Sequence, residues 1–228
     1  SIDGVSDRDF ILDLANCITT SMMHLTRLSE ELILWSSEEF NFINLPDNVV
    51  TTSSMMPQKR NPDYPELIRG KFGRTVGNLV SILTMLKALP LSYNRDMQED
   101  KEPIFDSLDT YTSSIEVMIE IIKGADFNDK AMLDSTSGNI LATDLADILV
   151  MKGIPFRESH ITISKLTKKL QKDGKSISDL SESELSKILG EEIEIDNNKS
   201  INSRNIVAGT SEDRVKEEIK VAKRILNI

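Results

Sequence analysis

Apolar residues recur at three- and four-residue spacing along three stretches of the chain, and this period predicts three amphipathic helices. The first stretch covers residues 6–40, with Ser6 as the expected N-cap and acidic side chains in the first turn. The second covers residues 67–86, and the third covers residues 105–124. Helices of roughly 20 residues are about 30 Å long, so they predict an extended helix bundle.

Two polar inserts separate these helical stretches. Residues 41–65 lose the period, contain four prolines and are rich in small polar side chains, which is typical of a long loop. The second insert, residues 91–103, reads "LSYNRDMQEDKEP". Long loops between well-formed helices are often functional. Spacing alone leaves a working loop and a passive connection open for the first insert, and it favours a solvated connection for the second.

The helical segments become shorter after residue 134, which predicts a change of domain. Four are expected: residues 140–151, 157–172, 181–189, and a last helix from about Ser211. Thr210 or Ser211 can cap this last helix, and "EEIEID" is either strand or loop. The sequence therefore predicts an all-α protein, with a long-helix bundle in residues 1–134 and a small helical domain in residues 135–228.

The composition argues against nucleic acid and membrane as partners. The 228 residues carry 37 acidic and 27 basic side chains, a net charge of −10, which would repel the phosphates of a nucleic acid. No apolar run approaches the roughly 20 residues of a membrane span. A single cysteine, Cys17, favours a reducing compartment such as the cytoplasm. The chain starts at Ser1 without a signal sequence, so we expect it to be part of a longer protein.

Candidate chemistry lies first in residues 51–71. Ser53 and Ser54 precede Lys59 by six and five residues. A serine can act as a base or nucleophile only if its pKa is lowered, and Lys59, Arg60 and a nearby helix start could do this. The spacing is a weak signal, and a serine-rich turn with solvated basic residues stays open.

The histidines and the polar side chains of the second insert give weaker indications of a functional site. The two histidines, His24 and His160, do not suit a Ser-His-Asp triad, and we expect the first in a core or interface and the second to pack or cap. Neither lies in metal-ligand spacing, so no metal is predicted. In the second insert Tyr93, Gln98 and Lys101 form a set that could bind carboxylate, hydroxyl or amide groups.

The stretch "SSMMPQKRNPDYPE" resembles the signature of the aspartase/fumarase superfamily of lyases. "SIDGVSDRDF", "YNRDMQEDKE", "ATDLADILVMKGIPFRESH" and "AGTSEDRVKEEI" look like the argininosuccinate lyase family in particular. The resemblance spans nearly the whole chain. It implies a β-elimination that splits argininosuccinate into arginine and fumarate without a metal or an organic cofactor.

The resemblance also implies roles for residues of the signature. Ser53 would be the base, while Lys59 and Asn61 would hold the substrate carboxylate and stabilise the carbanion charge that spreads onto it. The loop would close over the substrate and exclude water. Thr52 stands where the signature normally has glycine, which changes the backbone freedom of this loop.

Four further residues match the family by position. Glu66 corresponds to an acid that orients a histidine from elsewhere in the assembly, and Tyr93, Gln98 and Lys101 correspond to residues that contact the substrate. The family forms homotetramers whose active sites draw on three subunits. Its N-terminal region has no counterpart here, so we expect this chain alone to be inactive. Adenylosuccinate lyase and a non-catalytic scaffold of the lens-crystallin kind are the alternatives.

Overall fold

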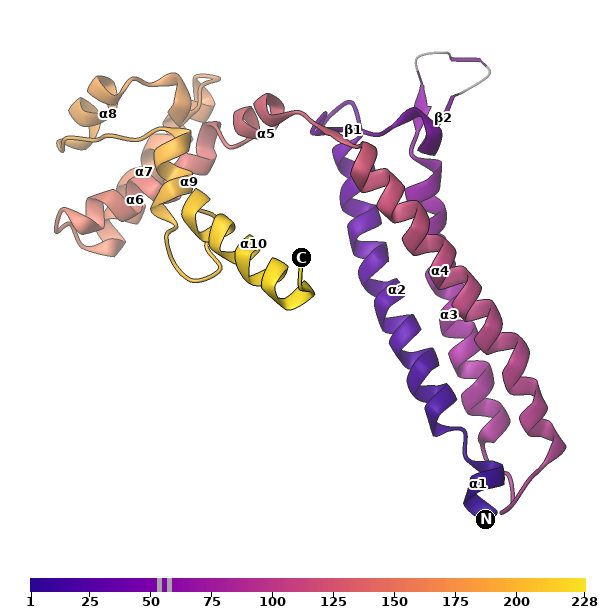
Figure 1. Ribbon diagram of the computed structural model, residues 1–228. Helices are drawn as coiled ribbons and strands as arrows, with labels where there is room; N and C mark the ends of the chain where they lie inside the picture. Colours follow the sequence, from indigo (N-terminus) through magenta and orange to yellow (C-terminus); the bar gives the residue numbers. More distant parts are fainter. Residues whose placement is uncertain (53–54, 57–58) are drawn as a thin grey trace. The chain divides into compact units, whose positions relative to one another are not determined.

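The structure is a computed structural model, which describes residues 1–52, 55–56 and 59–228. These residues form two compact units, residues 1–129 and residues 130–228. Helices make up nearly all the regular structure in both units (Figure 1), which confirms the predicted all-α class. The sequence predicts the domain boundary slightly later, after residue 134.

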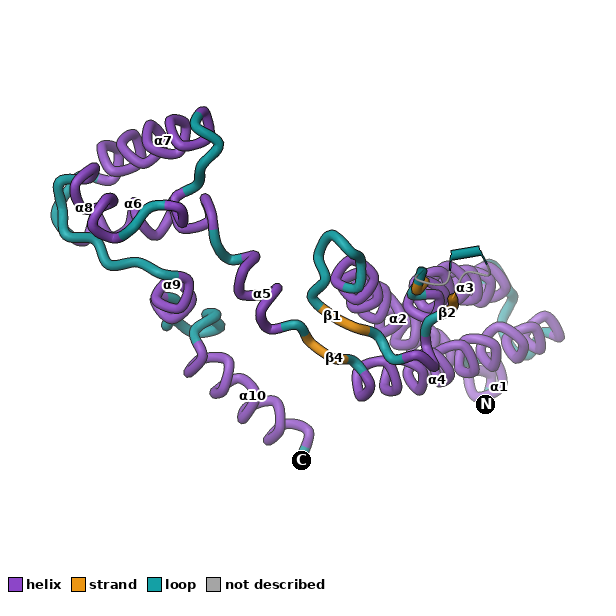
Figure 2. The backbone as a smooth tube through the Cα atoms, turned by 90° about the horizontal axis from the view of Figure 1, so that it is seen from above, coloured by secondary structure: helices purple, strands orange, loops and turns teal. Residues whose placement is uncertain are grey.

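Three long antiparallel helices form the first unit: α2 (Asp9–Trp35), α3 (Asp63–Leu86) and α4 (Lys101–Gly124). Figures 1 and 2 show them side by side, with the short α1 (Ile2–Ser6) at the end where α2 begins. Two apolar clusters fill the space between them, one around Met22 and Ile82 and the other around Leu32 and Ile121. The three predicted long helices are thus present and packed on one another.

Two helix starts differ from the prediction. Ser6 does not cap the first long helix, because it ends α1, and Arg8 occupies the N-cap of α2. The side chain of Asp7 accepts a hydrogen bond from the backbone N–H of Asp9 at 2.9 Å instead. Helix α3 begins at Asp63 rather than after Pro65. Proline is tolerated there because first-turn N–H groups have no acceptor within the helix.

Short strands organise the predicted loop before α3. Strand β1 (Ile43–Asn44) pairs antiparallel with β4 (Asp126–Phe127), and β2 (Thr51–Thr52) pairs antiparallel with β3 (Arg60–Asn61). A 3-10 turn, η1 (Asp47–Val49), lies between β1 and β2. A strand of two residues has no detectable alternation, so the sequence pattern could not predict these ladders.

The apolar stripe of α2 is wider than the surface that α3 and α4 cover. Ile18, Met22 and Leu32 are buried as expected, but Phe10 is 64% exposed and Leu14 and Leu28 are also exposed. Cys17 is exposed as well. Part of the predicted core face of this helix is therefore uncovered in the single chain.

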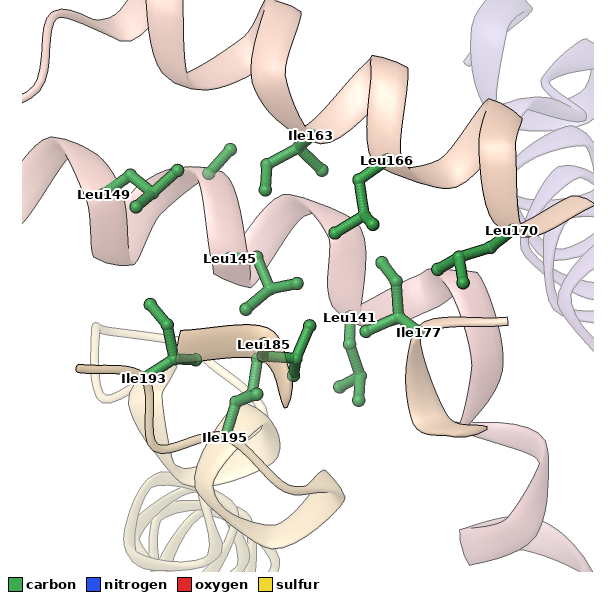
Figure 3. Close-up of a cluster of buried hydrophobic side chains, with 11 residues drawn as sticks. Leu141, Leu145, Leu149, Ile163, Leu166, Leu170, Ile177, Leu185, Ile193 and Ile195 are labelled. Carbon is green, nitrogen blue, oxygen red and sulfur yellow. The ribbon is translucent and has the colours of Figure 1, made fainter. Parts of the chain in front are cut away.

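The second unit is built from short helices: α5 (Asp129–Ser135, which starts at the junction), α6 (Ala142–Met151), α7 (Phe156–Lys172), α8 (Glu182–Leu189), α9 (Asn197–Ser203) and α10 (Glu212–Leu226). The 3-10 turns η3 (Gly138–Leu141) and η4 (Ile177–Asp179) connect some of them. Side chains from α6, α7, α8 and the two 3-10 turns meet in one apolar cluster, in which Leu145 and Ile177 are fully buried (Figure 3). The "EEIEID" stretch is irregular, yet Ile193 and Ile195 from it point into this cluster.

None of the helices in the described residues is long and apolar enough to cross a membrane.

Candidate functional site

The stem of the signature loop is well tied to the bundle. Thr51 pairs with Asn61 across the β2–β3 ladder, and its hydroxyl donates to a carboxylate oxygen of Asp63 at 2.5 Å. The guanidinium of Arg60 donates to the Asp47 carboxylate at 2.6 Å and to the Leu45 carbonyl at 2.7 Å. These bonds commit the guanidinium of Arg60 to the stem, although the side chain is still 41% exposed.

The predicted catalytic residues of this loop are placed only in part. Ser53, the predicted base, and its neighbour Ser54 lie outside the described residues. Lys59 is exposed, and its backbone N–H donates to the carbonyl of Met56 at 3.0 Å. Asn61 is half-buried in β3, and Glu66 is exposed in the first turn of α3. Lys59, Asn61 and Glu66 thus belong to one end of the bundle.

Thr52, the departure from the signature, lies in strand β2 opposite Arg60. An extended backbone suits a β-branched side chain. This position therefore does not need the positive φ that glycine would permit.

The second predicted group lies together on the segment that leads into α4. The side-chain amide of Gln98, in the 3-10 turn η2 (Arg95–Asp100), donates to the Tyr93 hydroxyl at 3.1 Å. Lys101 begins α4, and its ammonium pairs with the carboxylate of Asp100. Tyr93, Gln98 and Lys101 are exposed, whereas Asp100 is fully buried.

Sequence reasoning missed the ion pair beneath this segment. Arg8 Nε donates to Asp100 Oδ2 at 2.7 Å, although the two residues are 92 positions apart. No local spacing links them. The only available signal was that an acid sits inside a stretch resembling the family's substrate-contact motif.

The two predicted groups lie at opposite ends of α3. Asn61 ends β3, with one residue between it and the start of this helix, and Tyr93 follows the C-terminal end of the helix at Leu86. A helix that runs from Asp63 to Leu86 is about 36 Å long. In one copy of the chain, the described residues of the signature loop therefore cannot meet Tyr93, Gln98 and Lys101 around one small substrate.

Between these ends, α3 and α4 are joined by a polar network. Nε and Nη2 of Arg74 both donate to the carboxylate of Asp106, and the amide of Asn78 donates to it at 2.7 Å. The hydrogen bond from Arg74 is the main cause that lowers the pKa of Asp106. Asp106 is thus held as a carboxylate in an interhelix ion pair.

The two histidines lie in different surroundings. His24 is exposed in the middle of α2, so the core position predicted for it is wrong within this chain, and an interface position stays a prediction. His160 on α7 packs against Phe156, with ring centroids 6.2 Å apart, which agrees with the predicted packing role. The described part of the chain contains no group of three or more His, Cys, Asp or Glu side chains able to hold a metal ion.

Comparison with known proteins accounts for the fold and for both polar segments. A lyase family model matches residues 1–77, and an argininosuccinate lyase C-terminal model matches residues 139–208. The chain is 49% identical to the argininosuccinate lyase of Ruthia magnifica subsp. Calyptogena magnifica, over 99% of this chain and 48% of that protein. It is 46% identical to the argininosuccinate lyase of Carboxydothermus hydrogenoformans, over 99% of this chain and 51% of that protein.

Solved structures show the same architecture. EDDS lyase in complex with formate superposes with a TM-score of 0.83 at 26% identity, over 99% of this chain and 48% of that one. The class II fumarase of Schistosoma mansoni shares the fold, with a TM-score of 0.65 at 19% identity, over 78% of this chain and 36% of that one.

The long-helix bundle shares its fold with a class II fumarase, and residues 1–77 match a lyase family model. Among lyases, the chain is similar to argininosuccinate lyases over nearly its whole length. It spans about half the length of the relatives it matches.

Proposed function

We propose that the protein to which these residues belong cleaves argininosuccinate into arginine and fumarate by β-elimination. The observation that carries this proposal is the identity of 46–49% to argininosuccinate lyases over 99% of the chain. That similarity includes both the signature loop and the segment around Tyr93, Gln98 and Lys101.

The chemistry follows from what an elimination needs. A proton leaves the carbon next to a carboxylate, and the resulting negative charge spreads onto that carboxylate. We assign Ser53 as the base, with Lys59 and Asn61 binding the carboxylate that receives the charge. An exposed ammonium beside a tethered loop stem, as Lys59 is, suits this role. Glu66 is assigned to orient a histidine supplied by another part of the assembly.

The second group of residues would bind the rest of the substrate. Tyr93 and Gln98 supply hydroxyl and amide groups, and Lys101 supplies a cation for a second carboxylate. Because the two groups lie at opposite ends of α3, a complete site needs at least two copies of the chain. We therefore propose a homotetramer with shared active sites, located in the cytoplasm, that uses neither a metal nor a cofactor.

Fumarate release tests this proposal. Ultraviolet absorbance would follow fumarate formed from argininosuccinate, and separately from adenylosuccinate, by the 228-residue chain and by a full-length protein that contains it. We expect release from argininosuccinate alone, and only by the full-length protein.

Two other outcomes decide between the alternatives. Release from adenylosuccinate instead would assign the adenylosuccinate lyase reaction, which shares the signature loop and the fumarate product. No release from either substrate by the folded full-length protein would favour the scaffold role.

A further inference from the structure

Asp100 is a fully buried carboxylate at the junction of η2 and α4, next to the predicted substrate residue Lys101. It occupies the N-cap of α4, but its side chain makes no capping hydrogen bond. An N-cap aspartate normally accepts from an N–H of the first helical turn. Here Oδ2 instead accepts from Arg8 Nε at 2.7 Å, and Oδ1 accepts from the ammonium of Lys101. Both carboxylate oxygens thus face cationic side chains.

The burial of these groups determines where the net charge lies. A buried carboxylate is costly unless it is paired, and Asp100 is paired twice. The Arg8 side chain is 16% exposed, and the Lys101 side chain is 54% exposed. Two positive charges around one negative charge leave one positive charge in excess. The more exposed cation of this trio is Lys101.

Arg8 fixes the carboxylate from a distant part of the chain. Its guanidinium also donates to the Asp7 carbonyl at 2.7 Å, so the side chain is held at the start of α2. A guanidinium is planar and presents its donors in fixed directions. Asp100 therefore has one rigid partner, Arg8, and one flexible partner, Lys101.

We propose that Asp100, held by Arg8, is a positioning residue that sets the direction in which the Lys101 ammonium meets a substrate carboxylate. A lysine side chain has several rotatable bonds and samples many rotamers when nothing holds it. An ammonium has three N–H donors, and the bond to Asp100 uses one, which directs the others away from the buried carboxylate. This inference rests on the proposed function, because it requires Lys101 to bind substrate.

Steady-state kinetics with argininosuccinate would test the proposal in a full-length protein that contains this chain. The variants are Asp100→Asn, Lys101→Met and the double variant, with Asp106→Asn as a matched control that breaks an ion pair elsewhere on α4. We expect Asp100→Asn to raise KM about tenfold with kcat changed less than about threefold, since Lys101 holds a carboxylate before and during the reaction. Asp106→Asn should leave both constants within about twofold.

The double variant separates positioning from a structural role. If Asp100 acts through Lys101, Asp100→Asn has no further effect on kcat/KM once Lys101→Met is present. Multiplication of the two single effects would overturn the proposal. If Asp100→Asn does not fold, Asp100→Glu keeps the buried charge and moves the carboxylate by one methylene. It should raise KM in a variant that still melts cooperatively, although the added methylene at a buried site lowers the melting temperature. An unchanged KM in a folded Asp100→Glu would equally overturn the proposal.

Measurements on the unmodified protein separate failure of the proposed function from failure of the positioning role of Asp100. Absence of argininosuccinate cleavage by the unmodified protein would refute the proposed function, and the positioning role with it. Normal cleavage by both the unmodified protein and Asp100→Asn would refute the positioning role alone.

Discussion

Ser53 is the side chain on which the proposed chemistry depends most. Replacing it by alanine removes the proton acceptor but leaves the stem bonds of Arg60 and Thr51 untouched. We expect Ser53→Ala in the full-length protein to lower kcat by at least about 100-fold, because general-base catalysis contributes roughly that much. Fumarate release measures the change.

Ser54→Ala is the matched control, since it removes a hydroxyl from the adjacent position. It should retain activity within about tenfold. If Ser54→Ala instead abolishes turnover while Ser53→Ala does not, the base role moves to Ser54.

The three long helices and the short helices α6, α7, α8 and α10 were predictable, whereas α1, α5 and α9 were not. The long helices present many periodic apolar positions, whereas α9 reads "NNKSINS", without a single apolar stripe. It forms because Asp196 caps it, accepting from the N–H of Lys199 at 2.7 Å. For the site, the chain positions of Lys59 and Lys101 were predictable from motif resemblance. Their separation by the length of α3 follows from the folded structure and not from the motifs.

Helix α8 depends on a reciprocal cap at its start. Ser181 Oγ accepts from the N–H of Glu184 at 3.3 Å, and the Glu184 carboxylate accepts from the N–H of Ser181 at 2.8 Å. Ser181→Ala should lower the free energy of opening of α8 by about 1 kcal/mol, measured by hydrogen exchange of its amides. The same change at exposed Ser183, inside the helix, should be neutral or slightly stabilising.

The same cap predicts an acid sensitivity. The pKa of Glu184 is lowered, chiefly by the hydrogen bond from the Ser181 backbone, and the pKa of Asp179 is lowered in the same way by Ser176. A carboxylate whose pKa is lower in the folded state stabilises it at neutral pH. This contribution is lost as the pH falls below the ordinary glutamate value, about 4.3, and through the lowered one.

Hydrogen exchange across pH tests this expectation. Glu184→Gln should weaken the protection of the α8 amides at pH 7, and its difference from the unmodified chain should shrink as the pH falls below about 4. Glu192→Gln, at an exposed carboxylate in the same unit, controls for general charge effects. A difference that persists unchanged at low pH would contradict the role of the Glu184 carboxylate.

A single copy of the chain leaves apolar surface uncovered and holds the two proposed parts of the site far apart. Exposed apolar side chains such as Phe10, Leu14 and Leu28 on α2 are surface that further copies can bury. Under the proposed function, the signature loop and the Lys101 segment, at opposite ends of α3, would come from different copies.

Mixed oligomers would reveal such sharing directly. Lys59→Met and Lys101→Met should each lower fumarate release by a full-length protein that contains this chain to a small residual rate, since each removes a carboxylate-binding cation from every site. When the two variants are unfolded together and reassembled, a site that takes one group from each of two copies receives both intact groups in about a quarter of random pairings. Fumarate release should therefore recover to roughly a quarter of the unmodified rate. Reassembly of each variant alone is the control, and mixed oligomers that stay inactive would place both lysines' contributions within one copy.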